Sequence, residues 1–245
     1  MKKFGLIGYP LSHSFSVGYF AEKFTRENIR DCEYLNFPID SITEFSGLIR
    51  SNSELCGLNV TIPYKEQVIP FLDEIETTAK RIGAVNTIKF ILSRDKKILK
   101  GFNTDIYGFS EALREIMSKK VENALILGTG GASKAVAFSL DEMGIKYSFV
   151  SRKTGHLAYS NLDKSIIDQH KLIINTTPLG TYPDIDVFPD IPYRFLTSSH
   201  ILFDLIYNPA ETVFLRKGRE QGARIVNGLR MLHLQAEKSW EIWNS

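Results

Sequence analysis

The sequence predicts an α/β protein with two domains, and three observations lead to this prediction. Short apolar segments typical of strands alternate with segments of helical spacing along the 245 residues. The run at 124–127 is fully apolar, as in the strands of a buried parallel sheet. The length suits one large domain or two domains of about 100–130 residues each. Strand–helix alternation over such a length is typical of α/β architecture.

The first half opens with an apolar strand at 4–8, and a helix follows at 16–26, where Val17, Phe20 and Phe24 recur at helical spacing. Further apolar runs predict strands at 33–37, 57–62, 85–91 and 98–102. The last two of these form a hairpin, because a polar turn separates them. Helical spacing predicts the other helices of this half at 42–50, 65–71, 73–82 and 105–119.

The second half begins near Val121 and continues the alternation. Strands are predicted at 124–127, 147–150, 157–159, 172–175, 201–204 and 223–226. The helices between them are predicted at 133–143, 163–169 and 212–221. Gly228 opens a last helix, and the apolar stripe along that helix predicts packing against a core: Leu229, Leu232, Ala236, Trp240 and Trp243.

Polar side chains interrupt the strand predicted at 57–62. Asn59 and Thr61 lie two positions apart and therefore share one face of the strand, while the aliphatic residues that alternate with them point into a core. Pro63 ends the strand and suits the first position of a helix, which places Lys65 in the first helical turn. A lysine is unfavourable there because the helix dipole favours anions. The sequence therefore indicates a functional role for the Lys65 amine.

A glycine-rich turn follows the apolar strand at 124–127 and opens a helix. Its residues are Gly128, Thr129, Gly130, Gly131, Ala132 and Ser133. Gly128 allows a tight turn, Gly130 allows close approach of a pyrophosphate, and the helix N-terminus offers amides to phosphates. Ser133 occupies the third glycine position of the dinucleotide fingerprint. The turn predicts a Rossmann dinucleotide site, and the alternative is a tight turn that binds no ligand.

The end of the following strand indicates the cofactor. An NAD site usually has an acid there, which binds the ribose 2′-hydroxyl. Here the strand ends in Ser151, Arg152 and Lys153, without an acid. Arginine can bind a 2′-phosphate bidentately, whereas a carboxylate would repel it. The sequence therefore predicts NADP, and the alternative is a solvated pair of surface cations.

Two further groups have both a structural and a functional interpretation. Asp105 follows a strand, where aspartate commonly caps a helix or lies in its first turn. Ser12, Ser14 and Ser16 form a hydroxyl-rich loop before a helix. One of these hydroxyls caps that helix in the structural interpretation. In the functional interpretation, the hydroxyls bind a small polyhydroxy or carboxylate ligand.

These segments together resemble the shikimate dehydrogenase family over nearly the full chain. The matching segments agree in content, order and spacing: 8–16, 59–65, 83–87, 103–105, 128–133, 175–180, 204–209 and 228–235. The resemblance implies reversible, NADP-dependent reduction of 3-dehydroshikimate to shikimate, in aromatic amino acid biosynthesis. The expected organisation is a substrate domain of residues 1–103, to which the final helix at 228–245 returns, and a Rossmann domain at 104–227.

The resemblance also implies roles for individual residues. Lys65 and Asp105 would form a catalytic acid–base pair. The expected contacts with shikimate are Ser14, Ser16, Asn59, Thr61, Asn86, Asp105, Tyr207 and Gln235. The expected contacts with NADP, beyond the glycine-rich turn and residues 151–153, are Thr176, Thr177, Pro178, Gly228 and Met231.

The chain departs from the family pattern at a few positions. Tyr9 and Val17 stand where the family usually has Asn and Pro, and Lys153 where it usually has Thr. The stretch at 154–171 is short for the adenosine side of the site. The enzyme alternative is a quinate/shikimate dehydrogenase that uses NAD(P), because a pocket excludes an added hydroxyl poorly. A non-catalytic, ligand-sensing relative is the other alternative, and we expect such a relative to lack Lys65 or Asp105.

Composition excludes some other functions. The net charge of +2 gives no electrostatic case for binding nucleic acid. Cys32 and Cys56 form neither a disulfide framework nor a metal-binding spacing, so no metal is predicted. The apolar run after the N-terminal lysines breaks at Gly8 and Pro10, and no segment approaches the ~20 apolar residues of a membrane span. We expect a cytoplasmic monomer or homodimer with a small-molecule substrate.

Overall fold

The structure is a computed structural model that describes residues 1–11, 14–93, 96–117 and 121–245. It divides into two compact units. The first consists of Met1–Thr104 and Ala236–Ser245, and the second of Asp105–Gln235. Expectations for Ser12, for the centre of the turn at 93–96 and for the end of the helix at 105–119 lie outside the described residues.

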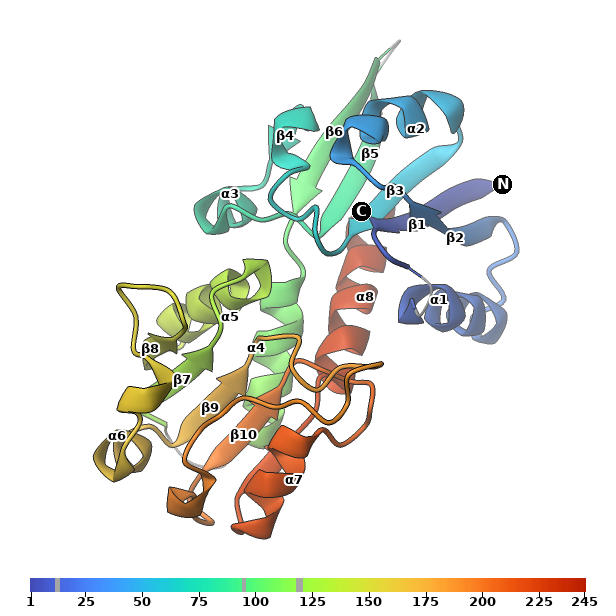
Figure 1. Ribbon diagram of the computed structural model, residues 1–245. Coiled ribbons are helices and arrows are strands. Elements are labelled where there is room, and N and C mark those ends of the chain that lie inside the picture. The colour runs from blue at the N-terminus through green and yellow to red at the C-terminus, as the bar shows by residue number, and fades with distance from the viewer. Residues whose placement is uncertain (12–13, 94–95, 118–120) are drawn as a thin grey trace. The chain divides into compact units, whose positions relative to one another are not determined.

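The first unit is built on a six-stranded mixed sheet (Figure 1). In spatial order its strands are β2 (Cys32–Pro38), β1 (Lys2–Gly8), β3 (Leu55–Val60), β5 (Thr87–Ser93), β6 (Lys96–Phe102) and β4 (Glu74–Ile75). The chain begins at β1, adds β2 on one side and then returns to add β3 on the other, and all three strands are parallel. The strand order therefore reverses at β1 and β3, and ligands of open α/β sheets bind outside the carboxyl ends at such a point.

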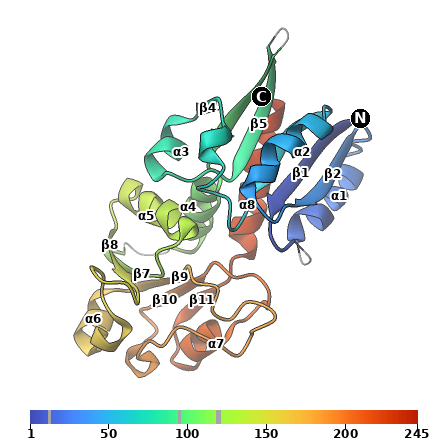
Figure 2. The ribbon, with the colours of Figure 1, turned by 45° about the horizontal axis from the view of Figure 1, so that its top comes forward.

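Helices cover both faces of this sheet. On one face, α1 (Phe15–Arg26) and the end of α8 (Leu229–Asn244) pack in an aromatic core that includes Phe4, Phe20 and Trp243. On the other face, η1 (Ile42–Glu44) and α2 (Phe45–Ser51) cover a core that contains Ile7 and Leu58. Figure 2 shows α2 and α1 on opposite sides of the sheet. The final helix is divided between the units: residues 236–245 belong to the first unit, whereas the start of the helix, expected there as part of 228–245, belongs to the second.

The second unit contains a fully parallel five-stranded sheet. Its spatial order is β11 (Arg224–Val226), β10 (Ile201–Asp204), β9 (Leu172–Asn175), β7 (Asn123–Leu127) and β8 (Lys146–Val150). Here the strand order reverses between β7 and β9, because β8 lies on the other side of β7. This arrangement confirms the predicted Rossmann architecture, and its ligand position is the edge where β7 and β9 end.

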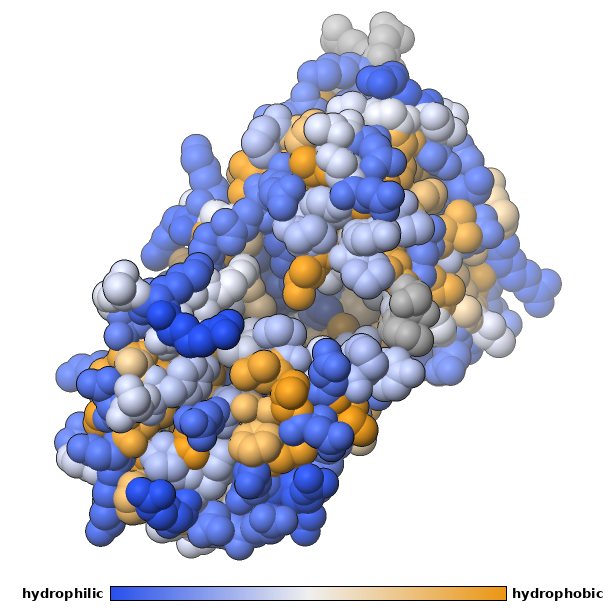
Figure 3. Space-filling model, viewed as in Figure 1, coloured by the Kyte–Doolittle hydropathy of each residue, from blue (hydrophilic) through white to orange (hydrophobic). Residues whose placement is uncertain are grey.

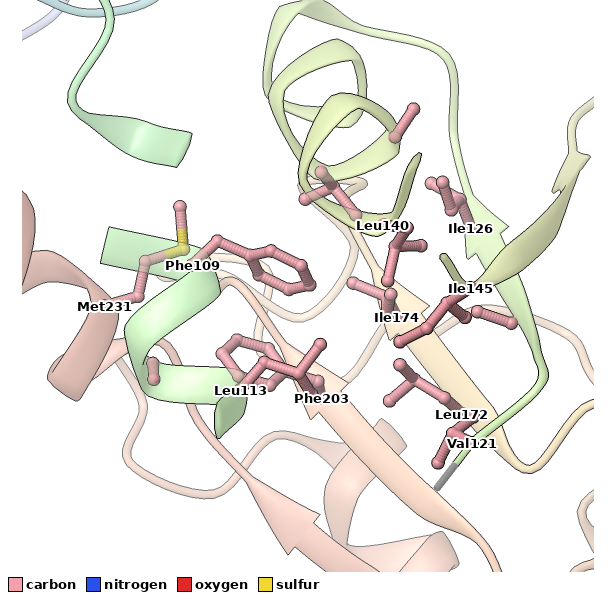
Figure 4. Close-up of a cluster of buried hydrophobic side chains, with 14 residues drawn as sticks. Phe109, Leu113, Val121, Ile126, Leu140, Ile145, Leu172, Ile174, Phe203 and Met231 are labelled. Carbon is pink, nitrogen blue, oxygen red and sulfur yellow. The ribbon is translucent and has the colours of Figure 1, made fainter. Parts of the chain in front are cut away.

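Hydrophobic cores lie on both faces of the second sheet. Figure 4 shows one of them, in which Phe109 and Leu113 of α4 (Asp105–Ile116) and Leu140 of α5 (Gly131–Glu142) pack against Ile174 and Phe203 of the sheet. The opposite core includes residues of α6 (Lys164–Gln169) and α7 (Val213–Glu220). Both faces are covered, which is why β9 consists of buried residues throughout.

Three local predictions are wrong. No α-helix forms at 65–71, where turns lead into the short 3₁₀ helix η2 (Ile69–Phe71), because Pro70 has no N–H to donate to the preceding turn. The helix predicted at 73–82 is α3 (Thr77–Ile82), preceded by β4, which pairs with β6. The strand predicted at 157–159 is a single bridge from Leu157 to Val150, followed by the 3₁₀ helix η3 (Tyr159–Asn161).

The visible surface is largely polar. Figure 3 shows hydrophilic side chains over most of this face, with hydrophobic side chains in small groups, as is normal for folded proteins. None of the helices within the described ranges has the length and hydrophobicity that crossing a lipid bilayer requires.

Candidate active site

The carboxyl ends of β1 and β3 bring two predicted segments together. The Thr61 N–H donates to the Ile7 carbonyl at 2.9 Å, and the Tyr9 N–H donates to the Ile62 carbonyl at 3.1 Å. Gly8 permits this approach, because a Cβ on it would lie 2.3 Å from the Thr61 methyl carbon. The start of the serine loop and the segment after Asn59 are therefore neighbours at one sheet edge.

The strand at this edge is shorter than predicted. It ends at Val60, so Thr61 follows the strand instead of belonging to it. Ile62 is 71% exposed and is not the core residue that strand alternation predicted. Asn59 is the last polar residue within the strand, and its side chain is half-buried.

Ser14 and Ser16 lie at the start of α1. Ser14 occupies the position before the first helical residue, yet its side chain makes no capping hydrogen bond. Among the described residues its buried hydroxyl has no hydrogen-bond partner, a condition that costs about 1–3 kcal/mol unless a ligand or water satisfies it. The capping role is therefore wrong for Ser14. Ser16 is half-buried in the first turn of α1.

Hydrogen bonds hold the Asn59 side chain at both ends. Its Oδ1 accepts from the Tyr34 hydroxyl at 2.8 Å. Its Nδ2 donates to Ser239 Oγ at 2.9 Å, to Thr87 Oγ1 at 3.2 Å and to the Asn86 carbonyl at 3.3 Å. The amide is therefore fixed in position before any ligand binds.

Asn86 and Lys65 are anchored through their main chains beside β3. The Asn86 carbonyl accepts from the Val60 N–H at 2.9 Å, and the Lys65 carbonyl accepts from the Val85 N–H at 2.8 Å. Lys65 lies in a turn and not in a helix, so the helix-dipole interpretation of this residue is wrong. The first unit therefore places Thr61, Lys65 and Asn86 beside the carboxyl end of β3, where Asn59 lies, while Ser14 and Ser16 lie at the start of α1.

Asp105 is buried in the first turn of α4 and opens the second unit. The same helix packs closely against α8 at Gly108, where a Cβ would lie 2.6 Å from the Met231 carbonyl and 3.1 Å from the Gln235 Cβ. Two predicted ligand contacts of α8, Met231 and Gln235, are thus held against the first turns of α4.

The glycine-rich turn lies at the point where the strand order reverses in the second sheet. Gly128 has a φ of 103°, and a Cβ on it would lie 2.9 Å from the Thr177 methyl carbon. The Thr176 N–H and hydroxyl both donate to the Leu127 carbonyl, at 3.0 and 2.6 Å. Residues 176–177 after β9 are therefore held against the turn after β7.

The first turn of α5 is open toward this edge. A Cβ on the exposed Gly130 would meet no atom within 4 Å, so the backbone there is accessible to a ligand. The helix begins at Gly131, whose N-terminal amides suit a phosphate. Ser133 fits in place of the third glycine because its buried hydroxyl donates back to the Gly130 carbonyl at 2.6 Å.

The residues after β8 offer cations and no acid. Arg152 and Lys153 are exposed, and the Lys153 N–H donates to the buried Ser151 hydroxyl at 3.1 Å. The Ser151 N–H donates to the Leu157 carbonyl at 2.9 Å, which folds the short following segment back onto β8. The glycine-rich turn, the open helix start and these cations fit a dinucleotide with a 2′-phosphate.

Asp204 joins the loops that follow β9 and β10. It accepts from Asn175 Nδ2 at 3.0 Å and from the Thr212 hydroxyl at 2.6 Å, and burial raises its pKa to about 6. Asn175 Oδ1 in turn accepts from the Thr177 N–H at 3.0 Å and from its hydroxyl at 2.6 Å. Through Asn175, Asp204 therefore helps to fix the predicted cofactor loop at residues 176–178.

The segment that carries Tyr207 packs against the start of α8. The Gly228 N–H donates to the Ile206 carbonyl at 2.9 Å, and a Cβ on Gly228 would lie 2.0 Å from the Leu205 carbonyl oxygen. Only glycine fits there, so packing alone requires a glycine at position 228, in addition to the predicted ligand contact. Tyr207 is half-buried directly after this contact.

Three supporting residues were not predicted from the sequence: Tyr34, Ser239 and Asp204. The available signals were a polar residue near the apolar stripe of the last helix for Ser239 and an acid that ends an apolar strand for Asp204. Tyr34 gave no signal, because its strand also suits a core tyrosine.

Comparisons with known proteins relate both units to one family. The model of the shikimate dehydrogenase substrate binding domain matches residues 6–88. The shikimate dehydrogenase (NADP(+)) of Carboxydothermus hydrogenoformans is 40% identical over 264 residues, which cover 98% of this chain and 90% of the relative.

Two solved structures extend the similarity to the whole fold. Shikimate 5-dehydrogenase from Thermus thermophilus, in complex with NADP(H) and shikimate, is 30% identical with a TM-score of 0.87, and the match covers 99% of this chain and 93% of that chain. The Listeria monocytogenes enzyme, in complex with shikimate and NAD, is 27% identical with a TM-score of 0.85, and the match covers 100% of this chain and 92% of that chain.

Proposed function

The chain belongs to the shikimate dehydrogenase family, and we propose that it catalyses the reversible, NADP-dependent reduction of 3-dehydroshikimate to shikimate. It is an oxidoreductase of the shikimate pathway, and its cofactor is NADP. One observation in this chain carries the assignment: at the start of α1, the buried Ser14 hydroxyl has no hydrogen-bond partner within the described part of the chain. A small polyhydroxy acid supplies the complementary groups.

We assign the second unit to NADP. The turn at Gly128 and the open start of α5 would hold the pyrophosphate, and Arg152 with Lys153 would hold the 2′-phosphate. Residues 176–178, Gly228 and Met231 are assigned to the rest of the cofactor from the resemblance. When bound, the nicotinamide supplies the hydride that reduces the substrate carbonyl carbon.

We assign the substrate to polar side chains of both units. Those of the first unit are Ser14, Ser16, Asn59, Thr61 and Asn86, and those of the second are Asp105, Tyr207 and Gln235. The side-chain hydrogen bonds of Asn59 support a preorganised site, because a fixed amide loses little freedom when the substrate binds.

Lys65 and Asp105 are our candidates for proton transfer. Reduction of the carbonyl needs a proton at its oxygen, and Lys65 can donate one from its amine. Asp105 can accept a hydrogen bond from that amine or from a substrate hydroxyl. A positioned acid of this kind typically contributes about 10²–10⁴-fold in rate. The two groups act as a pair, so the proton is assigned to the pair and not to one residue.

The alternative function is a quinate/shikimate dehydrogenase that also accepts NAD. The similarity to the Listeria monocytogenes structure with shikimate and NAD supports a test of the second cofactor. A non-catalytic ligand-sensing role is less well supported, because Lys65 and Asp105 are both present.

The deciding experiment measures oxidation of shikimate and of quinate by the purified protein, each with NADP and with NAD. We expect kcat/KM to be highest for shikimate with NADP. Equal turnover of quinate would favour the alternative enzyme, and binding of shikimate without turnover with either cofactor would favour the sensing role.

We also propose a cytoplasmic location and a monomeric or homodimeric state. Both cysteines, Cys32 and Cys56, are free thiols, which suits a reducing compartment. Cell fractionation tests the location, and light scattering after gel filtration gives the mass of the particle in solution.

A further inference from the structure

A buried hydroxyl of the last helix lies among the side chains assigned to the substrate. Ser239 of α8 is fully buried in the first unit. Its Oγ lies 2.9 Å from Asn59 Nδ2, 2.8 Å from Thr87 Oγ1 and 3.2 Å from Thr104 Oγ1. One hydroxyl therefore contacts β3, β5 and the residue that directly precedes Asp105.

The main chain fixes the orientation of the Asn86 amide. The Thr104 N–H donates to Asn86 Oδ1 at 2.7 Å, and a backbone N–H cannot accept a hydrogen bond. The oxygen of the amide must therefore face Thr104. The hydroxyls of Thr104 and Thr87 donate to the same oxygen, each at 3.2 Å. The Nδ2 of Asn86, which is a hydrogen-bond donor, then faces away from the Thr104 N–H.

The main chain also fixes the Asn59 amide. Its Nδ2 donates to the Asn86 carbonyl at 3.3 Å, and a carbonyl can only accept. The Tyr34 hydroxyl consequently donates to Asn59 Oδ1 at 2.8 Å. Tyr34 is itself buried and stacks on Phe20 with ring centroids 4.3 Å apart, so its hydroxyl has little freedom to move.

Ser239 bridges the two amides. Its Oγ accepts from Asn59 Nδ2 at 2.9 Å, because the nitrogen of a side-chain amide can only donate. It also lies 2.8 Å from Thr87 Oγ1, whose hydroxyl donates to Asn86 Oδ1 at 3.2 Å. It links the amide of Asn59 with a hydroxyl that holds the amide of Asn86.

We propose that Ser239 is a positioning residue of the substrate site, which holds the Asn59 and Asn86 amides in their donor and acceptor orientations. Tyr34 has the same role at the other end of the Asn59 amide. This inference rests on the proposed function, because it assumes that the two amides contact shikimate. Ser239 acts through these amides and does not itself contact the substrate.

The test compares Ser239→Ala with a matched deletion, Ser139→Ala. Ser139 is also fully buried, but among the residues that the structure describes its hydroxyl donates to backbone carbonyls of α4 and α5 only. We expect Ser239→Ala to raise KM for shikimate about tenfold, the effect of one buried hydrogen bond, with kcat and KM for NADP changed less than about twofold. Ser139→Ala should lower the melting temperature about as much as Ser239→Ala does. It should change neither the KM for shikimate nor the KM for NADP.

A double-mutant cycle separates positioning from stability. In an Asn59→Ala background, Ser239→Ala should have a much smaller effect on KM for shikimate, because its main route to the substrate is already absent. Tyr34→Phe removes only a hydroxyl and should raise KM for shikimate alone. It also provides the test if Ser239→Ala does not fold.

Two results would overturn the inference. The first is an unchanged KM for shikimate in folded Ser239→Ala or, if that variant does not fold, in Tyr34→Phe. The second is an equal effect of Ser239→Ala on KM for shikimate with and without the Asn59 side chain. Failure of the proposed function gives a different result, since the wild-type protein would then not oxidise shikimate. Normal wild-type turnover with an unaffected variant contradicts the positioning role alone.

Discussion

Asp204 and Asn175 are the paired last residues of the neighbouring strands β10 and β9, and the Asn175 side-chain amide donates to the Asp204 carboxylate at 3.0 Å. The carboxylate is fully buried and also accepts from the Thr212 hydroxyl and from the Ile206 N–H. One carboxylate thereby ties together the loops after two strands and the start of α7.

The protonation of this carboxylate should make stability depend on pH. Burial raises the pKa of Asp204 from 3.8 to about 6. Between these values the folded protein holds a proton that the unfolded chain has lost, so stability falls as the pH rises from about 4 to about 6, by on the order of 3 kcal/mol. Urea unfolding across this range measures the effect. Asp204→Asn should remove this part of the slope, and an identical slope in the variant would contradict it.

His200 should produce the opposite trend. It is fully buried, its Nδ1 accepts from the Thr197 N–H at 3.0 Å, and its Nε2 lies 3.0 Å from the Ile167 carbonyl. Burial lowers the pKa of His200 below 6.5. The unfolded chain therefore binds a proton first as the pH falls below about 6.5, and stability decreases. The imidazole resonances of His200 should titrate below pH 6.5 in NMR spectra, and titration above that value would refute the assignment.

Lys65→Ala should lower kcat by about 10²–10⁴-fold, because the variant lacks one member of the proposed acid–base pair. The free energy of unfolding should change little, since Lys65 lies in a turn outside the helices and strands. Lys80→Ala, at an exposed position in the last turn of α3, is the matched control and should have normal turnover. Near-normal turnover of Lys65→Ala would exclude the residue from catalysis.

Arg152→Ala should weaken the binding of NADP selectively. Loss of a charge-assisted bond to the 2′-phosphate should raise KM for NADP about tenfold or more, with little change in KM for NAD. Arg50→Ala, an exposed arginine of α2, controls for the loss of a surface charge. Equal effects of Arg152→Ala on both cofactors would argue against a 2′-phosphate contact.

Gly128→Ala should affect cofactor binding more than an ordinary glycine substitution does. Both Gly128 and Gly144 have positive φ, of 103° and 69°, so an alanine at either position costs about 1–2 kcal/mol in backbone strain. A Cβ on Gly144 meets nothing within 4 Å, whereas one on Gly128 lies against Thr177. Calorimetry should show weaker NADP binding for Gly128→Ala only. Equal affinity in both variants would contradict the steric explanation.

Periodicity predicted most of the fold, because burial of one face fixes the spacing of apolar residues in strands and helices. It failed at 65–71, where the apolar spacing is helical but Pro70 removes a required donor. It also missed β4, a two-residue strand that exists only because β6 is available to pair with it. Short elements depend on tertiary partners and carry little signal of their own.

The candidate site was predictable only in part for a similar reason. Asn59 and Thr61 stand out in the sequence as polar residues in an apolar run. Ser239 reaches Asn59 across 180 positions of the chain, and no local pattern encodes such a contact. Hydrogen bonds among distant side chains appear only when the fold has brought their strands and helices together.

The division of α8 between the two units has a consequence for the order of folding during synthesis. Residues 105–235 form a contiguous unit, whose hydrophobic cores consist of its own residues. The first unit is discontinuous, because Trp243 packs on Phe4, and Glu237 pairs with the buried Lys23. The strands and helices of residues 1–104 therefore cannot complete their packing until residues 236–245 have been synthesised.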